Sequence, residues 1–220
     1  MRASPRSSRS GSRASAADGD VVDAGLSEPS ERLLALIREL CRRESVNPAL
    51  RYVVNTHWHS EHTGGNETLA AAGALVVAHE NVLRLLSQDQ VMAHLRDRLV
   101  PAAPERARPR LTFKNRINLS WNQDLIYVVH APNTHSNGDV IVPFRDADVI
   151  HMGDILNDNY PFIDVDFDGH IGRIIRAVDE PWRTLGGVRC SFRGMARWPI
   201  VRICCATGTC LRRYGTTCRL

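Results

Sequence analysis

One segment, HWHSEH at residues 57–62, constrains what this chain can fold into more than any other feature. It supplies three imidazoles and a carboxylate directly after an apolar stretch, RYVV, that is typical of a buried strand. In an extended segment His57 and His59 point to the same side, so both can bind one metal ion, while the turn at Glu61 and His62 can present a second ligand set. Zinc prefers neutral imidazole and carboxylate ligands, so the sequence predicts a zinc site where a strand ends.

A histidine-rich surface loop without a metal is the alternative for this segment, because a His-x-His pair also arises by chance. The residues that follow, Thr63-Gly64-Gly65-Asn66, argue against that alternative. Two successive glycines permit the sharp turn that takes the chain from a ligand loop into the next helix. We therefore interpret the segment as a metal-binding loop.

Alternating strand and helix patterns surround this loop and predict an α/β sandwich with functional residues at strand ends. One or two amphipathic helices are expected over residues 81–99. The proline-rich residues 101–110 are expected to form a loop or flap that walls a pocket together with Trp121. The other expected elements are strands at 21–25, 51–54, 74–78, 111–113, 117–119, 125–130, 139–144 and 149–152, and helices at 33–40, 67–72 and 171–178.

Composition narrows the class of protein further. With 220 residues, 43% of them hydrophobic and 24% charged, the chain suits one soluble globular domain, and no apolar run approaches the roughly 20 residues that span a bilayer. Residues 181–220 hold eight Arg and no acidic residue, which leaves residues 1–180 with 20 basic and 24 acidic side chains. This acidic body argues against a nucleic-acid-binding core. We expect a small-molecule substrate, with neither nucleic acid nor a membrane as partner, and the oligomeric state stays open.

Both ends of the chain differ in composition from its body. Residues 1–20 open with an Arg/Ser-rich stretch, which predicts a disordered leader or a transit peptide. No secretory signal is seen, and a cytoplasmic location is slightly favoured over others. Five of the six cysteines lie in the last 40 residues at spacings that match no disulfide framework or zinc finger. The expected division is therefore a leader at 1–20, a domain at 21–180 and an atypical Arg/Cys-rich tail at 181–220.

Four motifs in order resemble the metallo-β-lactamase fold family of metallohydrolases. The loop at 57–65 is similar to the family's His-x-His-x-Asp-His followed by a Gly-rich turn. HSNGD at 135–139 resembles its later His and Gly-Asp, HMGD at 151–154 resembles its strand-end Gly-Asp, and YPFID at 160–164 continues the likeness. The resemblance covers residues 21–180, points to the β-lactamase-like general hydrolases, and implies an αββα sandwich that is incomplete at both ends.

The resemblance also implies a chemistry and a ligand set. A zinc-bound hydroxide would cleave an ester, thioester, lactone or β-lactam bond, with Glu61 and Asp154 as catalytic residues. The family's ligands fall on six positions around one or two zinc ions per chain: His57, His59 and His135 for the first, and Glu61, His62 and Asp154 for the second, with Asp154 between the two.

Two features depart from the family pattern. Glu61 stands where the family has Asp, and its extra methylene displaces the carboxylate by about 1 Å or more, a misplacement that can cost about 10²-fold in rate. The family closes its second site with a later Gly-His-Gly, whereas residues 181–220 contain no His. The codons for residues 192–196 permit Pro-Gly-His-Gly in another reading frame. We therefore hypothesise a frameshifted C-terminus, with a genuine extension as the alternative.

Three functions follow as hypotheses. The first is a zinc-dependent hydrolase, whose substrate the fold does not fix. The second is a catalytically impaired metal-binding remnant, a pseudoenzyme without a complete second zinc site. The third is nucleic-acid binding through the Arg-rich tail. Of the residues left over, His130 and His151 are expected in the core or behind the ligands, His79, His94 and His170 have no assigned role, and Cys41 is expected to be buried as a small apolar residue.

Overall fold

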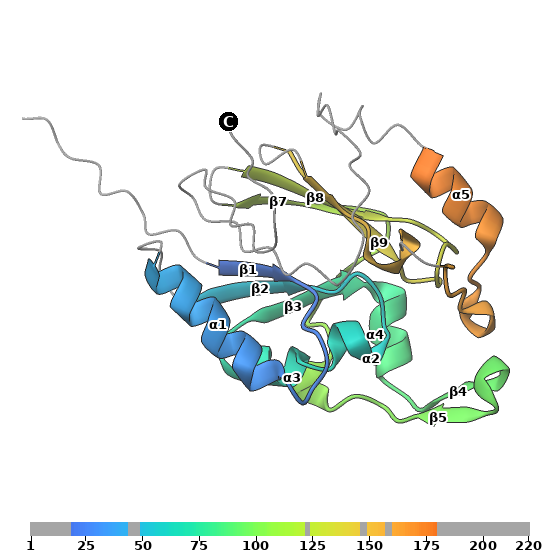
Figure 1. Cartoon of the computed structure of the whole chain (residues 1–220), viewed down its shortest axis with the longest axis horizontal. Helices are drawn as coiled ribbons and strands as arrows, with labels where there is room; N and C mark the ends of the chain where they lie inside the picture. The colour runs from blue at the N-terminus through green and yellow to red at the C-terminus, as the bar shows by residue number, and fades with distance from the viewer. Residues whose placement is uncertain (1–18, 44–48, 122–123, 146–148, 157–159, 180–220) are drawn as a thin grey trace, which may run out of the picture.

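Two facing β-sheets with helices on their outer sides make up the part of the chain that the computed structural model describes, residues 19–43, 49–121, 124–145, 149–156 and 160–179 (Figure 1). The Arg/Cys-rich tail with its frameshift hypothesis, and the leader up to residue 18, lie outside these residues. Gly19 and Asp20, which we assigned to the leader, instead belong to the first strand, where both are buried.

The first sheet is parallel and has the strand order β1-β2-β3-β6. Its Val-rich strands are suited to burial on both faces, because helices cover one face and the second sheet covers the other. Since the strands are parallel, the loops that follow β1, β2 and β3 leave the sheet at the same edge. The strands are β1 (Gly19–Val22), β2 (Leu50–Val54), β3 (Leu75–His79) and β6 (Leu111–Phe113).

The second sheet is antiparallel, with the order β10-β9-β8-β7. Alternation along β9 divides its side chains between two layers, as expected for a pleated strand. Val140 and Val142 pack into the core between the sheets, and Ile141 packs on the opposite side with residues of the last helix. The strands are β7 (Arg116–Trp121), β8 (Asp124–His130), β9 (Val140–Phe144) and β10 (Val149–His151).

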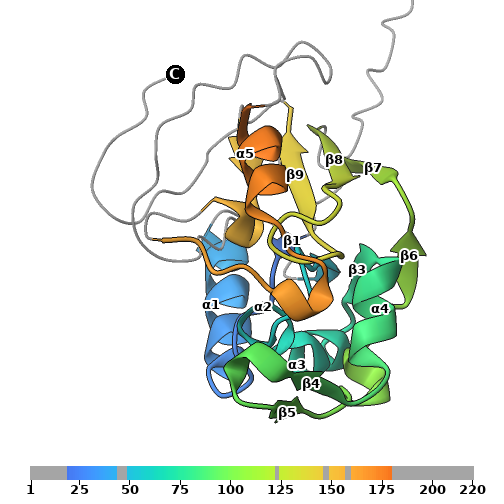
Figure 2. The same ribbon diagram turned by 90° about the vertical axis from the view of Figure 1, so that its right-hand side faces the viewer.

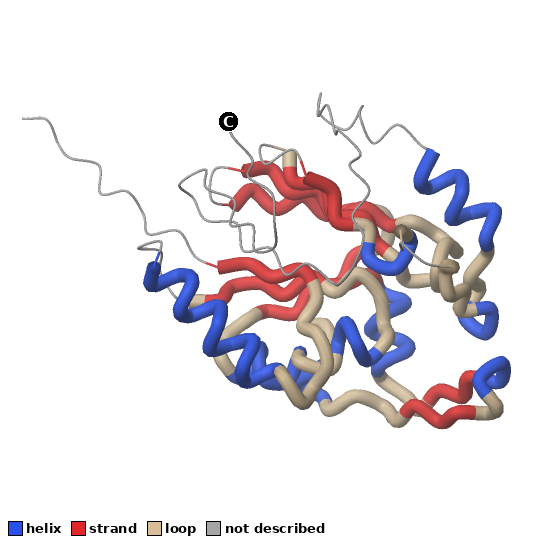
Figure 3. The backbone as a smooth tube through the Cα atoms, in the orientation of Figure 1, coloured by secondary structure: helices blue, strands red, loops and turns tan. Residues whose placement is uncertain are grey.

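Helices form the outer layers and complete the expected αββα sandwich (Figures 1, 2 and 3). The helix α1 buries Leu34, Ile37 and Cys41, which are three and four residues apart and therefore lie on one face. Cys41 is fully buried, as expected, and this burial raises the pKa of its thiol. Helices α1 (Ser30–Arg43), α3 (Asn66–Ala71) and α4 (Glu80–Leu86) cover the first sheet, and α5 (Ile171–Asp179) covers the second.

The helical prediction for residues 81–99 is correct only to the end of α4. The chain then forms a two-stranded antiparallel hairpin of β4 (Gln90–Met92) and β5 (Arg98–Val100), with the 3₁₀ turn η1 (Ala93–Leu95) at its tip. Arg96 and Asp97 have φ angles of 59° and 55°, in the left-handed region that a right-handed helix excludes. This turn contains neither Gly nor Asn, so the sequence carried no ordinary hairpin signal.

The proline-rich residues 101–110 form a loop with one 3₁₀ turn, η2 (Glu105–Ala107). That loop packs on α3, where the carbonyl of Ala107 accepts a hydrogen bond from Asn66 Nδ2 at 2.9 Å. No helix among the described residues is long and apolar enough to cross a membrane.

Candidate metal centre

The histidine loop begins where β2 ends, between β1 and β3. A reciprocal pair of amide hydrogen bonds between Asn55 and Asn66, at 3.0 and 2.9 Å, joins the start of the loop to the start of α3. Both glycines of this loop have ordinary negative φ angles. Their role is close approach instead, since a Cβ on Gly65 would collide with the carbonyl oxygen of Ala24. The loop is therefore held against the segment that follows β1.

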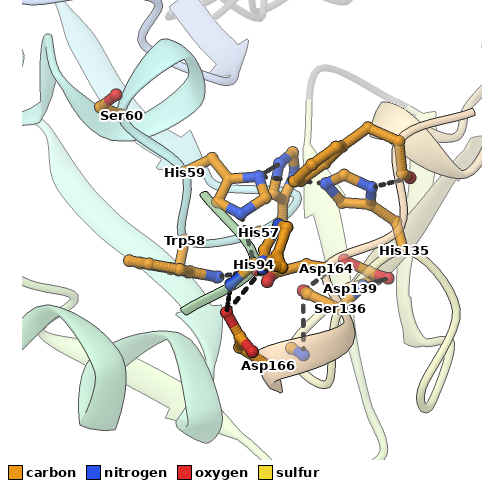
Figure 4. A network of polar contacts seen from close by, with 12 residues as sticks. His57, Trp58, His59, Ser60, His94, His135, Ser136, Asp139, Asp164 and Asp166 are labelled. Atoms are coloured by element: carbon orange, nitrogen blue, oxygen red, sulfur yellow. Dashed lines mark hydrogen bonds and ion pairs between the residues drawn. The ribbon is translucent and has the colours of Figure 1, made fainter. Parts of the chain in front are cut away.

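Three ring nitrogens converge at one point and define the first ligand group, His57, His59 and His135 (Figure 4). His59 Nδ1 lies 3.1 Å from His57 Nε2 and 3.1 Å from His135 Nε2. All three residues are buried, with at most 6% of their surface exposed. The chain thus brings together two residues of one loop and a third from a loop 76 residues later.

The outer nitrogen of each ring fixes which nitrogen carries the proton. His135 Nδ1 must donate to the carbonyl oxygen of Phe162, 2.9 Å away, because a carbonyl only accepts. His59 Nε2 contacts Asp164 Oδ2 at 2.7 Å, an oxygen that also accepts the Trp58 Nε1 proton at 3.1 Å. In their neutral form, both rings therefore turn an unprotonated nitrogen toward the point of convergence.

The proton of His57 also lies on its outer nitrogen, Nδ1, because of a chain of hydrogen bonds through Thr56. Thr56 Oγ1 donates its only proton to Asp23 Oδ2 at 2.8 Å, so it accepts from His57 Nδ1 at 3.0 Å. Burial, followed by the charges of His62 and His135, lowers the pKa of His57 well below its ordinary value. His57 Nε2 is consequently a lone-pair donor as well.

Three lone pairs facing one another at about hydrogen-bond distance repel unless a cation lies between them. Zinc binds imidazole nitrogen at roughly 2.0–2.1 Å in tetrahedral geometry, which separates its nitrogen ligands by about 3.3 Å. The two N···N distances of 3.1 Å fit that requirement closely. The residues present therefore suit a metal ion of this kind, and the outer hydrogen bonds orient each ligand.

Asp164 is the residue whose role sequence reasoning missed. Its side chain is fully buried, it orients His59 and Trp58, and its backbone N–H donates to the carbonyl of His135 at 2.9 Å. One of its oxygens, Oδ1, has no hydrogen-bond partner within the described part of the chain. The only signal in the sequence was its place in the YPFID motif, to which we attached no function.

Asp139 organises the loop that carries His135. Its carboxylate accepts hydrogen bonds from Thr134 Oγ1 at 2.6 Å and from the backbone and hydroxyl of Ser136 at 2.6 and 2.7 Å. Burial raises the pKa of Asp139 in spite of the nearby His135 and these donors. The Gly-Asp pair of this motif thus shapes the ligand loop from behind.

The second ligand group consists of His57, His62 and Asp154. His62 Nδ1 lies 2.8 Å from Asp23 Oδ2, and its Nε2 lies 3.2 Å from Asp154 Oδ1. Burial opposes a charge on His62, but the two carboxylates outweigh it and raise its pKa to about 10. Burial likewise opposes ionisation of Asp154, and the hydrogen bond from His62 overrides it and lowers the pKa of that carboxyl.

Five of the six predicted ligands therefore lie in these two groups, and Glu61 does not. Glu61 follows Ser60 in the short helix α2 (Ser60–Thr63), is exposed, and interacts with the Ser60 hydroxyl at 3.4 Å. Its position faces a pocket beside His59 rather than the point where the rings converge. A ligand role for Glu61 stays a prediction.

The remaining histidines lie outside both groups. His130 stacks on His79 with ring centroids 3.6 Å apart, and its Nε2 donates to the carbonyl of Asn137 at 3.0 Å. This places His130 behind the His135 loop, as expected. His94 pairs with Asp166 at 2.6 Å.

A pocket of about 210 Å³ opens beside His59. Residues 101–110 do not line it, and the β4–β5 hairpin, which precedes the proline-rich loop, forms that wall instead. The side chain of Trp121, the other predicted wall residue, lies outside the described part of the chain. The apolar lining residues are Trp58, Met92, Leu95, Val100 and Phe162, and the polar ones are His59, Ser60, Glu61 and Arg98.

An αββα sandwich with a buried cluster of histidines that could hold a metal ion at the edge of its parallel sheet defines a known fold class. The Metallo-beta-lactamase superfamily profile matches residues 17–191, and the chain belongs to this superfamily.

Comparisons with individual proteins agree with that class. The BLEG-1 B3 metallo-beta-lactamase is 18% identical, with a TM-score of 0.59 over 87% of this chain and 85% of that one. TTHA1623 in a di-iron-bound form is 21% identical, with a TM-score of 0.52 over 72% of each chain. A hydroxyacylglutathione hydrolase of Erythrobacter litoralis is 41% identical over 46 residues, which span only 20% of this chain and 18% of that protein. The two structural likenesses show a shared fold.

Proposed function

We propose that this chain is a zinc-dependent hydrolase that cleaves an acyl bond. The observation that carries the proposal is the convergence of three unprotonated ring nitrogens, each fixed by a hydrogen bond to its outer nitrogen. The first ligand group would hold the ion. When bound, zinc would polarise an acyl carbonyl and make a water molecule acidic enough to act as a nucleophile near neutral pH.

The protein's own contribution is to orient the ligands, to accept a proton and to hold the substrate. The carbonyl of Phe162, the carboxylate of Asp164 and the hydroxyl of Thr56 fix the three rings. Asp154 contacts His62, which lies beside the first group. As a partly buried carboxylate, Asp154 is the proposed acceptor for a proton released during attack. The pocket beside His59 would hold the acyl group of the substrate.

An ester or thioester is the first choice of substrate bond, with a lactone or β-lactam amide next. The short match to a hydroxyacylglutathione hydrolase supports a thioester, although it covers a fifth of this chain. Zinc is preferred to iron because the separations of 3.1 Å between the ring nitrogens fit tetrahedral zinc, although one structural neighbour was crystallised with two iron ions.

A metal-binding remnant without turnover is the second candidate, and one observation favours it. Glu61 occupies the position of an expected second-site ligand, yet it lies outside both ligand groups. If a productive site needs a carboxylate there, the chain would bind metal and fail to hydrolyse.

Metal content and hydrolysis measured together separate the two candidates. Untagged protein is assayed by inductively coupled plasma mass spectrometry and with p-nitrophenyl hexanoate, an acyl thioester and a chromogenic cephalosporin. We expect at least one zinc ion per chain and zinc-dependent turnover of the ester or thioester. Zinc without turnover of any substrate establishes the remnant, and protein that binds no zinc rules out both.

A further inference from the structure

The register of the β4–β5 hairpin decides which of its side chains face the pocket. Met92 pairs directly with Arg98, and Val91 pairs with Leu99. Opposed residues of a hairpin lie on the same face, and successive residues alternate between faces. Met92 is only 4% exposed, whereas Val91 and Leu99 are 53% and 60% exposed. Arg98 therefore shares the inner face with Met92, and both line the pocket.

The tip of the hairpin is anchored to the loop that supports the first ligand group. His94, in η1, donates from its backbone N–H at 3.1 Å and from Nδ1 at 2.6 Å to Asp166 Oδ2, in the turn η4 (Val165–Phe167) (Figure 4). The His94 ring also lies against Phe162, with centroids 5.3 Å apart. Because the carbonyl of Phe162 orients His135, the hairpin is set at a defined position beside the ligands.

The pocket combines an apolar lining with one cation. Trp58, Met92 and Phe162 supply much of the apolar wall, next to the ligand His59. None of the ion pairs among the residues that the structure describes involves Arg98. A volume of about 210 Å³ is below the roughly 300–1,000 Å³ of pockets for drug-sized ligands, so it suits a small acyl group rather than a whole large substrate.

We propose that Arg98 is a specificity residue that binds the carboxylate end of a short apolar acyl group, whose scissile carbonyl lies at the first ligand group. This inference rests on the proposed hydrolase function and deepens it. The guanidinium offers a carboxylate two parallel N–H donors, which favours this group over a neutral methyl end. Glu61 lines the same pocket and repels further negative charge, so the favoured acyl group carries a single anion.

Two esters of equal length test the charge preference. The monoanionic mono-p-nitrophenyl adipate and the neutral p-nitrophenyl hexanoate differ only in a carboxylate in place of a methyl group. For the zinc-loaded chain, with spontaneous hydrolysis subtracted, we expect kcat/KM to favour the adipate ester about three- to fivefold, the upper range for an ion pair at an exposed guanidinium such as that of Arg98. Arg98→Gln should remove this preference, because it lowers kcat/KM for the adipate ester more than kcat/KM for the hexanoate ester. Arg96→Gln, on the same hairpin and outside the pocket lining, is the matched control and should retain it.

Binding of the free acids provides a readout that does not depend on turnover. Isothermal titration calorimetry should show that adipate binds more tightly than hexanoate to the wild-type chain, and that Arg98→Gln cancels the difference while Arg96→Gln does not. If neither ester is hydrolysed and this binding difference persists, the hydrolase proposal fails and the role of Arg98 stands. The role of Arg98 is overturned if the wild-type chain binds the two acids with equal affinity and hydrolyses the two esters with equal kcat/KM. It is also overturned if Arg98→Gln lowers kcat/KM equally for both esters.

Discussion

The two ligand groups share His57 but differ in what would complete them. In the first, His59 Nδ1 lies 3.1 Å from a nitrogen of each of the other two rings, and the outer nitrogen of every ring donates a hydrogen bond to a partner behind it. In the second, His62 Nε2 faces a carboxylate oxygen of Asp154 at 3.2 Å, while its other nitrogen contacts Asp23. An imidazolium at His62, with a proton on each nitrogen, satisfies both carboxylates that face it in and beside the second group, whereas neutral rings in the first group leave three lone pairs facing one another.

This difference predicts how each group should respond to a metal ion. A cation resolves the repulsion in the first group, and because burial holds the pKa of His57 well below its ordinary value, a metal ion meets little competition from protons at that ring. In the second group a metal ion must displace a proton from a ring whose pKa the two carboxylates raise to about 10, and metal affinity falls accordingly at neutral pH. We therefore expect one tightly held ion in the first group and weaker occupancy of the second.

Removing a ligand found only in the first group should have the largest effect. In His135→Ala, zinc affinity should fall by more than roughly 100-fold, beyond the 10–100-fold typical of losing an outer hydrogen bond to a ligand. Metal content after dialysis should drop by at least one ion per chain. His170→Ala, an exposed histidine of the same region, is the control. If His135→Ala keeps its tight ion, the two groups have been ranked in the wrong order.

The effect of ligand orientation in the first group can be tested without substituting any of its three histidines. Asp164→Asn would weaken the acceptor for His59 Nε2–H and Trp58 Nε1–H, and zinc affinity should fall about 10–100-fold. Competition with a chromophoric chelator measures this change. Asp168→Asn, which keeps a residue that tolerates the left-handed φ of 64°, serves as the matched control. Equal affinities in the two variants would show that Asp164 only supports the fold.

Most of the metal centre was predictable because its ligands come from local motifs at strand ends. His57 and His59 lie in the loop that follows β2, His135 precedes a Gly-Asp pair, and Asp154 is the second residue of another. Asp164 was not predictable, since its contact with His59 joins residues 105 positions apart and no periodic pattern encodes it. The orientation of Glu61 was not predictable for a similar reason, because it depends on the start of a four-residue helix.

The fold was predictable where hydrophobic periodicity is strong, as in α1 and the Val-rich strands. It was not predictable over residues 81–99. There, apolar residues at helical spacing continue past Leu86, but the left-handed turn at Arg96 and Asp97 reverses the chain. Such a turn without Gly or Asn is set by tertiary contacts, among them the pair of His94 with Asp166.

A change of pH should affect the folding stability through His79 and through His62 with opposite signs. Burial, followed by the stacked His130, lowers the pKa of His79 to about 4, so the folded state resists a proton that the unfolded chain accepts near pH 6.5. Its contribution to stability is present above about pH 6.5 and is lost as the pH falls toward 4. The His62 ion pair has the opposite sign, because its raised pKa makes its contribution complete below about pH 6.5 and lost toward pH 10.

A variant isolates the His79 contribution from that of His62. The free energy of unfolding of the wild-type chain should fall when the pH is lowered from 7 to 5. In His79→Asn this fall should be smaller by about 1–2 kcal/mol, as measured by chemical denaturation. Asn retains an acceptor for the backbone N–H of Asn81, which His79 Nδ1 caps at 3.2 Å. Identical pH dependence in both proteins would mean that His79 does not carry this acid sensitivity.

The smallest effect is expected from Asp154→Asn, measured on the tightly bound ion. Asp154 belongs to the second group and contacts the first only through His62 and the shared His57, so zinc affinity of the first group should change less than about threefold at pH 7, within the range of screened charge effects. The weaker ion should be lost, because its only carboxylate ligand in that group is gone. A zinc titration with calorimetric detection resolves both events in one experiment. If the tight ion weakens as strongly as it does in Asp164→Asn, Asp154 is a ligand shared by both ions, and the two groups form one dinuclear centre rather than a strong site beside a weak one.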